Sequence, residues 1–474
     1  MLILLSLPAI GIVCTLVIDH FYDLHRVQTM CSLPGVSADP RMVRVCDEFG
    51  PVLLLRDASW IAFFASLVVP AVYFVIATLV GNNRFLVAVV FDLLVKLSIA
   101  ITVALVLVDA AIVVASLYYA FVLTISRIPV GLLAGIAIGA IIAAVSLVMS
   151  TFSLGRRLSL NVVGKRLSVA DHGKLIGVIE SIATKLGARP PDHVVVGLDP
   201  TFFVTSANVF VVGQGAKLSG ATLFLSAPLV RVLNSREVIA VLAHELGHFV
   251  GRDTFYTMRF APIYEQLQRS LSHLSSVTDA SDLAKLPGLA LLGILMSIFS
   301  RTERAIGRTR ELEADKVAAT LTGGEALVSA LIKVGLAVEM WSEIRKANID
   351  ALNSGRVADN LCDAFEHFVV ESLPSESGAL SRLIAASESQ KISHPTDTHP
   401  TTSERATSLG IDLDSVADQA VADLRNIAAS PPASRVLSED MEKELTMLEH
   451  HLVIQLGLAS PPKDNETVDH SGTS

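Results

Sequence analysis

Residues 234–250, NSREVIAVLAHELGHFV, are the stretch that decides the fold of the larger part of this chain. Asn234 is suited to cap a helix, with Glu237 at the third helical position as in a capping box. Apolar side chains then recur at helical spacing to about Val250. The segment His244-Glu245-Leu246-Gly247-His248 lies within this predicted helix.

Two histidines four residues apart share one face of a helix, and can therefore supply two nitrogen ligands to one tetrahedral zinc ion. Glu245 lies beside them, where it could hold a zinc-bound water rather than the metal. The alternative is an ordinary helix with two chance histidines. Because the chain has only 13 histidines in 474 residues, the metal site is favoured.

The third ligand must come from elsewhere in the chain. Thr254 stands where metzincins carry a third histidine, which excludes that class. Charged residues at 236, 252 and 253 flank the motif and argue against a place inside a membrane helix. Residues 307–322, GRTRELEADKVAATLT, offer Glu311 as the ligand and Asp315, one turn later, as a hydrogen-bond acceptor for a ligand histidine. The alternative is a solvated acidic face.

The composition places this chain among membrane proteins. It is 51% hydrophobic and 18% charged, with a mean hydropathy of +0.56. These values exclude disordered and collagen-like classes. The net charge is −9, and no basic run suggests a nucleic-acid partner. None of the 4 cysteines forms a CxxC pair.

The apolar residues concentrate in residues 1–150, which we expect to form a transmembrane region of about four helices. The predicted spans are 2–18, 60–80, about 98–124 and 128–149, with an extracytoplasmic loop at 19–59. The run 85–126 would make a helix of about 63 Å, twice the hydrocarbon thickness, so its number of spans stays open. Residues 2–18 could instead be a signal peptide, although no basic start or A-x-A site supports that reading.

Polar residues in this region carry three further expectations. Asp109 falls near the middle of a span. It is either a functional polar contact inside the bundle or a structural contact that holds two helices together, and the structural role is favoured. Basic residues just after the last span put the following domain in the cytoplasm. Cys31 and Cys46 lie in the outer loop, and a disulfide between them is a hypothesis.

The remainder of the chain has the composition of a soluble domain with a mainly α, α+β fold. We expect a helix at 170–187, a small sheet from 193–197, 202–212 and 221–226, and mostly helices afterwards. This domain spans 151–430. Residues 431–474 are expected to hold an amphipathic helix at 436–456 and a disordered tail.

The combination of H-E-L-G-H with E-x-x-A-D resembles the HtpX-like and CAAX-prenyl-protease group of membrane metallopeptidases, which have zincin-like catalytic domains of the gluzincin type. Asp253, five residues after His248, agrees with that family. Thr398-His399-Pro400 followed by Arg405 resembles its late H-P…R element, although His394-Pro395 offers a second H-P pair. The resemblance covers roughly residues 160–410.

The resemblance implies a role for each matching residue. His244, His248 and Glu311 would hold one zinc ion per chain, and Glu245 would be the general base and then the proton donor. Asp315 would orient a ligand histidine. His399 or Arg405 would steady the oxyanion. The strand around 202–212 would be the edge that binds substrate.

One feature departs from the family. HtpX-type members have further spans between the two metal motifs, whereas this chain offers only Leu286–Phe299, which is short for a span. A single crossing would put His244 and Glu311 on opposite sides of the membrane. We therefore expect this stretch to be buried, to dip into the membrane or to cover the active site.

The function implied is a membrane-anchored zinc metalloendopeptidase that hydrolyses peptide bonds through a zinc-bound water. Its substrates would be polypeptides, either unfolded segments or membrane-protein segments, in quality control or regulated cleavage. The expected location is the bacterial inner membrane, in contact with the lipid bilayer. The alternatives are a non-proteolytic zinc-binding scaffold or chaperone-like protein, and a CAAX-type protease that processes prenylated peptides. No oligomeric state is predicted.

Overall fold

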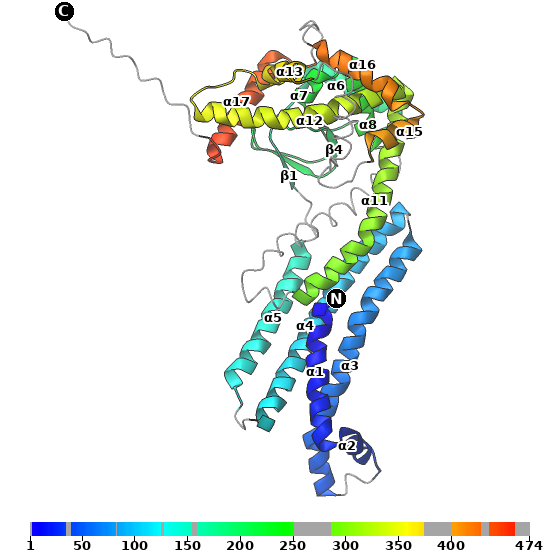
Figure 1. The fold of residues 1–474 in the computed structure, drawn as a ribbon, viewed down its shortest axis with the longest axis vertical. Helices are drawn as coiled ribbons and strands as arrows, with labels where there is room; N and C mark the ends of the chain where they lie inside the picture. Colours follow the sequence, from blue (N-terminus) through cyan, green and yellow to red (C-terminus); the bar gives the residue numbers. More distant parts are fainter. Residues whose placement is uncertain are drawn as a thin grey trace, which may run out of the picture. The chain divides into compact units, whose positions relative to one another are not determined.

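The structure is a computed structural model that describes residues 2–34, 39–81, 83–124, 128–153, 159–250, 286–373, 400–427 and 436–459. The chain divides into two compact units. The membrane unit comprises Met1–Arg156 and Arg259–Ala305, and the mixed unit comprises Arg157–Met258 and Ile306–Ser474. Figure 1 traces the elements of both. The expected fold class, a helical membrane region with a mainly helical domain around small sheets, is confirmed.

Five helices form the first part of the membrane unit. They are α1 (Leu2–Tyr22), α2 (Leu24–Cys31), α3 (Pro40–Val80), α4 (Arg84–Thr124) and α5 (Val130–Ser153). By length and composition, Leu4–Tyr22, Pro40–Val80 and Phe85–Val122 could each cross a membrane, and Val130–Val145 is a shorter apolar stretch.

The helix bounds differ from the expected ones in the predicted loop at 19–59, which also contains α2, and the structure answers the question left open for 85–126. Residues 40–59, expected as loop, are the first half of α3, which begins at the Asp39 cap with Pro40 in its first turn. Polar residues there lower the hydropathy, but the cap and the proline still start a helix. The run 85–126 holds one helix of 41 residues, α4.

Helices α1, α3 and α4 pack closely in the membrane unit. A Cβ atom added at Gly11 of α1 would lie 2.1 Å from Oγ of Ser59 and 2.5 Å from Cγ2 of Ile112. Only a glycine therefore lets the three helices meet at this level. Elsewhere in the interface Oγ of Ser98 donates to the hydroxyl of Tyr73 at 2.7 Å.

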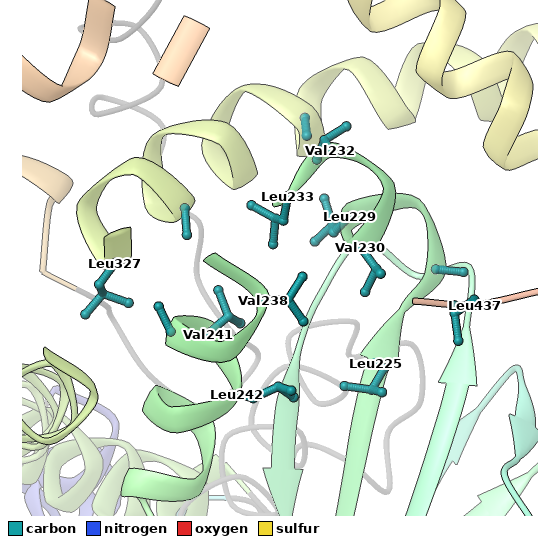
Figure 2. Close-up of a cluster of buried hydrophobic side chains, with 14 of the residues drawn as sticks. Leu225, Leu229, Val230, Val232, Leu233, Val238, Val241, Leu242, Leu327 and Leu437 are labelled. Carbon is teal, nitrogen blue, oxygen red and sulfur yellow. The ribbon is translucent and has the colours of Figure 1, made fainter. Parts of the chain in front are cut away.

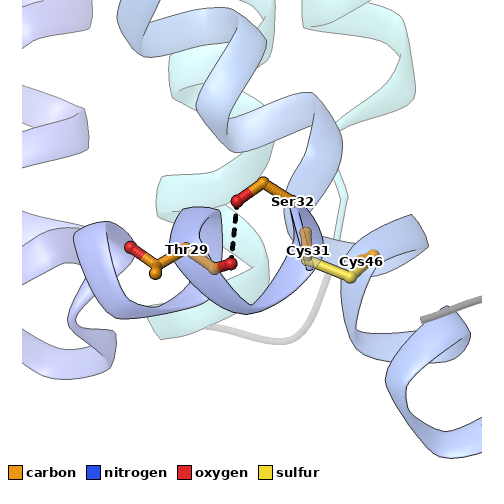
Figure 3. The surroundings of a disulfide bond; sticks show 4 residues. All are labelled: Thr29, Cys31, Ser32 and Cys46. Atoms are coloured by element: carbon orange, nitrogen blue, oxygen red, sulfur yellow. Dashed lines mark hydrogen bonds between the residues drawn. A yellow bond between two sulfur atoms is a disulfide. The ribbon is translucent and has the colours of Figure 1, made fainter. Parts of the chain in front are cut away.

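A disulfide joins the end of α2 to the first turns of α3. Figure 3 shows the bond between Cys31 and Cys46, which are separated by 15 residues. Beside it, Oγ of Ser32 donates to the carbonyl of Thr29 at 2.8 Å. The disulfide hypothesised from the sequence is thus present.

The mixed unit holds seven strands in the described part of the chain. They are β1 (Ser159–Val162), β2 (Lys165–Arg166), β3 (His193–Gly197), β4 (Phe203–Thr205), β5 (Asn208–Val211), β6 (Ala216–Leu218) and β7 (Thr222–Ser226). The orders are β1-β5-β6 in one sheet and β2-β3-β7-β4 in the other. The expected strand at 202–212 is divided into β4 and β5, because a turn in which the Thr205 hydroxyl accepts from the Ala207 N–H sends the chain to the second sheet.

The remaining described helices belong to this unit, except that α11 is shared with the membrane unit. They are α6 (Val169–Leu186), α7 (Ala227–Val232), α8 (Ser235–Gly247), α11 (Leu286–Thr322), α12 (Gly324–Asn353), α13 (Leu361–Ser372), α15 (Thr402–Leu409), α16 (Leu413–Arg425) and α17 (Glu439–Gln455). Figure 2 shows the core beneath α8, where Val238, Val241 and Leu242 belong to one buried cluster with Leu225 of β7 and Leu327 of α12. Each such burial is worth about 1.5–3 kcal/mol, so this core fixes α8 firmly.

Helix α11 carries the stretch expected at Leu286–Phe299. It is one helix of 37 residues, whose residues to Ala305 group with the membrane unit and whose later residues group with the mixed unit. The Phe299 ring packs against Phe91 of α4, with ring centroids 5.0 Å apart. Of the three expectations for this stretch, burial among membrane helices fits this contact, and the other two stay predictions.

The C-terminal helix α17 packs on the mixed unit through polar side chains. Arg231 of α7 is bonded to Glu442, and the carboxylate of Glu449 accepts from Nε of Arg345 at 3.0 Å. Nε2 of the buried His450 lies 3.0 Å from Oδ1 of Asn348.

Candidate metal centre

Helix α8 begins as the sequence predicts. Oδ1 of Asn234 accepts from the N–H of Glu237 at 3.0 Å, and Oε2 of Glu237 accepts from the N–H of Asn234 at 2.8 Å. Glu237 also pairs with the buried Lys333 of α12 at 2.8 Å, which ties the start of α8 to its neighbour. The helix ends at Gly247, three residues before the predicted end, so His248 is its C-cap.

A close contact between α8 and α11 brings the two motifs together. A Cβ atom added at Gly247 would lie 3.3 Å from Cα of Ala314. The two helices therefore approach with almost no side chain between them at this point. Sequence reasoning assigned no role to Gly247 or Ala314, and their only signal is that two small residues lie inside the two motifs.

Three side chains converge beside this contact. Nε2 of His244 lies 3.4 Å from Oε2 of Glu311, and Nε2 of His248 lies 3.5 Å from Oε1 of the same carboxylate. One ligand atom from each residue falls within 4.8 Å of the others. His244 and Glu311 are buried, and His248 is half-buried. The residues expected to bind metal are thus brought into one group.

The far side of the His244 ring contacts Asp315 and Arg405. Oδ1 of Asp315 is 2.9 Å from Nδ1 of His244, which is the hydrogen bond expected from the sequence. Arg405 of α15 donates to both Asp315 oxygens, at 2.8 Å and 2.5 Å, and its Nη2 is 3.3 Å from Nδ1 of His244.

The contacts of Arg405 leave its expected role, steadying the oxyanion, as a prediction. Its guanidinium bonds the carboxylate behind His244 instead of the side where Nε2 meets Glu311, and the residue is only 6% exposed. The other residue expected for that role, His399, lies outside the described residues.

The acid–base properties of these groups follow from their partners. Burial alone would lower the pKa of His244, but hydrogen bonds to Asp315 and Glu311 outweigh burial and raise the pKa to about 10. Although burial would raise the pKa of Asp315, its bonds to Arg405 and His244 hold it well below the ordinary value. Nε2 of His244 therefore lies where a cation, either a proton or a metal ion, is strongly favoured.

Glu245 completes the group. It follows His244 on α8, is half-buried, and its charge acts on Arg405 together with those of Glu311 and Asp315. Three carboxylates and one guanidinium leave a charge of −2 when both imidazoles are neutral. A divalent cation would cancel that charge.

The donor set fits zinc. Two imidazole nitrogens and one carboxylate are ligands that zinc accepts in catalytic sites, which keep a fourth position open for water or substrate. The hydrogen bond from Nδ1 of His244 to Asp315 is the support that metal-bound histidines generally have. His244, His248 and Glu311 are the residues that would hold the ion.

Comparison with known proteins gives three kinds of match. The family model described as peptidase family M48 matches residues 170–410. "Protease HtpX homolog" of Bifidobacterium longum is 26% identical over 220 residues, 44% of this chain and 69% of that protein. The proteins of the same name from Acidiphilium cryptum and Archaeoglobus fulgidus are 31% and 30% identical, over 35% and 34% of this chain and 57% and 46% of their own length.

A solved structure, that of S. mikatae Ste24p, aligns over 85% of this chain and 98% of its own at 16% identity, with a TM-score of 0.28. A TM-score this low does not establish a shared fold.

Proposed function

The chain belongs to peptidase family M48, and from this premise we propose that it is a zinc-dependent endopeptidase anchored in a membrane. The observation that carries the proposal is the group of His244, His248 and Glu311, whose ligand atoms lie within 4.8 Å of one another with Glu245 beside them. This is the arrangement needed for hydrolysis of a peptide bond at a metal centre. One ion per chain is proposed.

Each residue of the group has a distinct proposed task. When bound, zinc would polarise the scissile carbonyl and lower the pKa of a water molecule to about 7. Glu245 takes a proton from the attacking water and passes it to the leaving amine. Asp315 holds the Nδ1–H of His244, so that Nε2 presents its lone pair, and Arg405 holds Asp315 in place. His399 or Arg405 is the proposed oxyanion partner.

The proposed substrate is an extended polypeptide segment. Strand β4 is the outer strand of its sheet and contacts α8, which carries His244 and His248. A peptide could pair with its outer edge through backbone hydrogen bonds, which requires an unfolded segment. Membrane proteins that are damaged or marked for regulated cleavage would supply such segments close to an integral membrane enzyme.

The disulfide supports a cytoplasmic location for the mixed unit. Disulfides persist in oxidising compartments, so Cys31 and Cys46 belong on the outer side of the bacterial inner membrane. If α3, α4 and α5 each cross once, the chain after α5 lies on the opposite side. Labelling with a membrane-impermeant maleimide tests this in intact cells: the two cysteines should react only after reduction from outside, and labelling without reduction contradicts the proposal.

Metal content and peptide cleavage test the enzymatic proposal directly. Full-length protein in detergent is compared with Glu245→Gln and with Glu313→Gln, which changes an exposed carboxylate on α11. We expect one zinc per chain in all three proteins. Casein cleavage should fall about 10²–10⁴-fold in Glu245→Gln only, because the base is lost and the ligands are kept.

Other results separate the alternatives. Zinc without cleavage in the wild type favours a scaffold. Cleavage of a prenylated peptide with none of casein favours a CAAX-type enzyme. Failure of the wild type to retain zinc contradicts the assignment of the metal centre.

A further inference from the structure

The inner face of α4 carries polar side chains at a regular interval. Thr102, Asp109 and Ser116 follow one another at seven residues, two helical turns, and therefore share one face. They are 1%, 2% and 3% exposed. The face they share is buried, since Ile112, between Asp109 and Ser116, packs against Leu55 and Ala62 of α3.

These three side chains have polar atoms without a hydrogen bond. Within the described residues, Oγ1 of Thr102, Oδ1 of Asp109 and Oγ of Ser116 have no partner. Hydroxyls on the facing helices bond their own backbone instead, as Ser59 does to the carbonyl of Leu55 at 2.6 Å and Ser66 to that of Ala62 at 2.9 Å. An unmet carboxylate oxygen in such a place needs a chemical explanation.

No unpaired opposite charge is available to Asp109 in the packed helices, since Arg56 of α3 bonds Asp57 and Gln28, and Lys96 of α4 pairs with Asp92. It is the only charged residue of 97–124, and segments 2–18, 58–80 and 130–153 of α1, α3 and α5 contain no Asp, Glu, Lys, Arg or His. The titratable groups there are Tyr73, bonded to Ser98, Cys14, whose Sγ is 3.6 Å from the carbonyl of Ser116, and the neighbouring Tyr118 and Tyr119 on α4 itself. Helix α11 meets α4 at Phe91, about 27 Å along the helix from Asp109.

Among the described residues, an ionised Asp109 would therefore be unpaired inside the membrane. The cost of a charge at mid-membrane is about 2.5–3.5 kcal/mol on insertion scales and considerably more in simulations. A metal ion is unsuited to neutralise the Asp109 carboxylate, because hard cations take about six oxygen ligands. The next side-chain oxygens on this face of α4 are about 10 Å away. A basic side chain from a partner could not reach a residue that is 2% exposed.

We propose that Asp109 is an intramembrane proton-binding site, held as the neutral carboxylic acid at neutral pH within the α1–α3–α4 bundle. The ligand is a single proton, which joins the carboxylate without any leaving group. The bundle is then stable only while this proton is kept. This inference is independent of the metal centre.

Infrared spectroscopy of the full chain in liposomes tests the proposal. The difference spectrum of wild type minus Asp109→Asn at pH 7 should contain the carbonyl band of a neutral carboxylic acid, shifted when aspartate is labelled with ¹³C. A carboxylate pair of bands in its place overturns the proposal.

Stability against pH is the second measurement, because it does not depend on assigning a band. The amide side chain introduced by Asp109→Asn is neutral and can still donate, so the melting temperature of this variant should equal that of the wild type at pH 7. As pH is raised, the wild type should melt at progressively lower temperature than the variant. A wild type that stays level with the variant to alkaline pH, or a variant already less stable at pH 7, contradicts a bound proton. Zinc content should not change in either case, which separates this test from the test of the metal centre.

Discussion

The two units treat buried charge in opposite ways. In the mixed unit Arg405 pairs with Asp315, Lys333 pairs with Glu237, and Arg231 pairs with Glu442, all of them buried or nearly so. In the described part of the membrane unit Asp109 has no such partner within its helix bundle. A domain surrounded by water can bring opposite charges together from distant parts of the chain, whereas apolar helices offer none, so a proton is the simplest way to neutralise a carboxylate there.

Both units share one structural feature, a glycine at the point where two helices cross closely. Gly247 lets α8 approach α11, and Gly11 lets α1 approach α3 and α4. In the mixed unit the close approach assembles three ligand side chains. In the membrane unit it encloses the polar face of α4. The comparison therefore separates the contribution of buried charge pairs to stability from the contribution of close helix packing at glycines. Mutations can test each contribution.

The largest effect is expected from breaking the Arg405–Asp315 pair. Arg405→Ala leaves Asp315 buried without its guanidinium, a loss of about 3–5 kcal/mol in stability. Because Asp315 also orients His244, zinc affinity should fall about 10–100-fold. Thermal unfolding and competition with a chromogenic chelator measure the two effects.

The matched control is Arg308→Ala, which removes an ion pair with Glu404 between side chains that are 52% and 42% exposed. Such exposed pairs are worth about 0–1 kcal/mol. Arg405→Lys should recover part of the stability and of the zinc affinity. If Arg405→Ala loses no more stability or zinc affinity than Arg308→Ala, the Arg405–Asp315 pair has no positioning role.

In the membrane unit the corresponding large effect is steric. Gly11→Ala places a methyl group 2.1 Å from Oγ of Ser59, so the helices must separate, at a cost of about 1–3 kcal/mol. Melting in detergent should show it, and adding Ser59→Gly should restore part of the loss. Gly135→Ala in α5, where an added Cβ meets nothing within 4 Å, is the control. Equal melting of the two single variants would mean that α1 does not pack as described.

A smaller steric effect is expected where α8 crosses α11. At Gly247 the added Cβ would be 3.3 Å from Cα of Ala314, so Gly247→Ala should cost about 1 kcal/mol and shift His248 away from Glu311. Zinc affinity should therefore fall more than stability does. Gly177→Ala in α6, with nothing within 4 Å, should be neutral or stabilise by about 0.5–1 kcal/mol. Unchanged zinc affinity in Gly247→Ala would show that the helices can separate without harm to the ligands.

Local rules explain why some of these features could be predicted from the sequence. A spacing of four residues puts His244 and His248 on one face of any helix, and Asn234 with Glu237 starts that helix wherever it lies. The position of Arg405 depends on a pairing with Asp315 across 90 residues of sequence, which no local pattern encodes. The same holds for the contact of Gly247 with Ala314.

The length of α3 shows a second limit. Hydropathy marks residues 60–80, but the helix starts at Pro40, after the Asp39 cap, because capping and proline placement, not apolar content, decide where a helix begins. The division of 202–212 into β4 and β5 likewise depends on one side-chain bond, from the Ala207 N–H to the Thr205 hydroxyl.

The smallest effect is expected for a charge at the surface of the mixed unit, where neither pairing nor packing is strong. Oδ2 of Asp192 accepts from the N–H of Ala221 at 2.7 Å, and this bond, with a further contribution from Arg189, lowers the pKa of Asp192. A lowered pKa in the folded state stabilises the protein above the unfolded pKa of about 3.9, and the stabilisation disappears as pH falls through the folded value.

Asp192→Asn should therefore be less stable than the wild type at pH 7 by under about 1 kcal/mol, since the carboxylate is partly exposed. The difference should vanish as the pH falls below 4, and denaturant unfolding at several pH values measures it. Asp350→Asn, at an exposed position on α12, is the control and should follow the wild type. A gap between Asp192→Asn and wild type that persists in acid would mean that the Ala221 contact acts through shape instead of charge. In that case the stabilisation by charge that is expected for the buried pairs would not extend to the surface of the mixed unit.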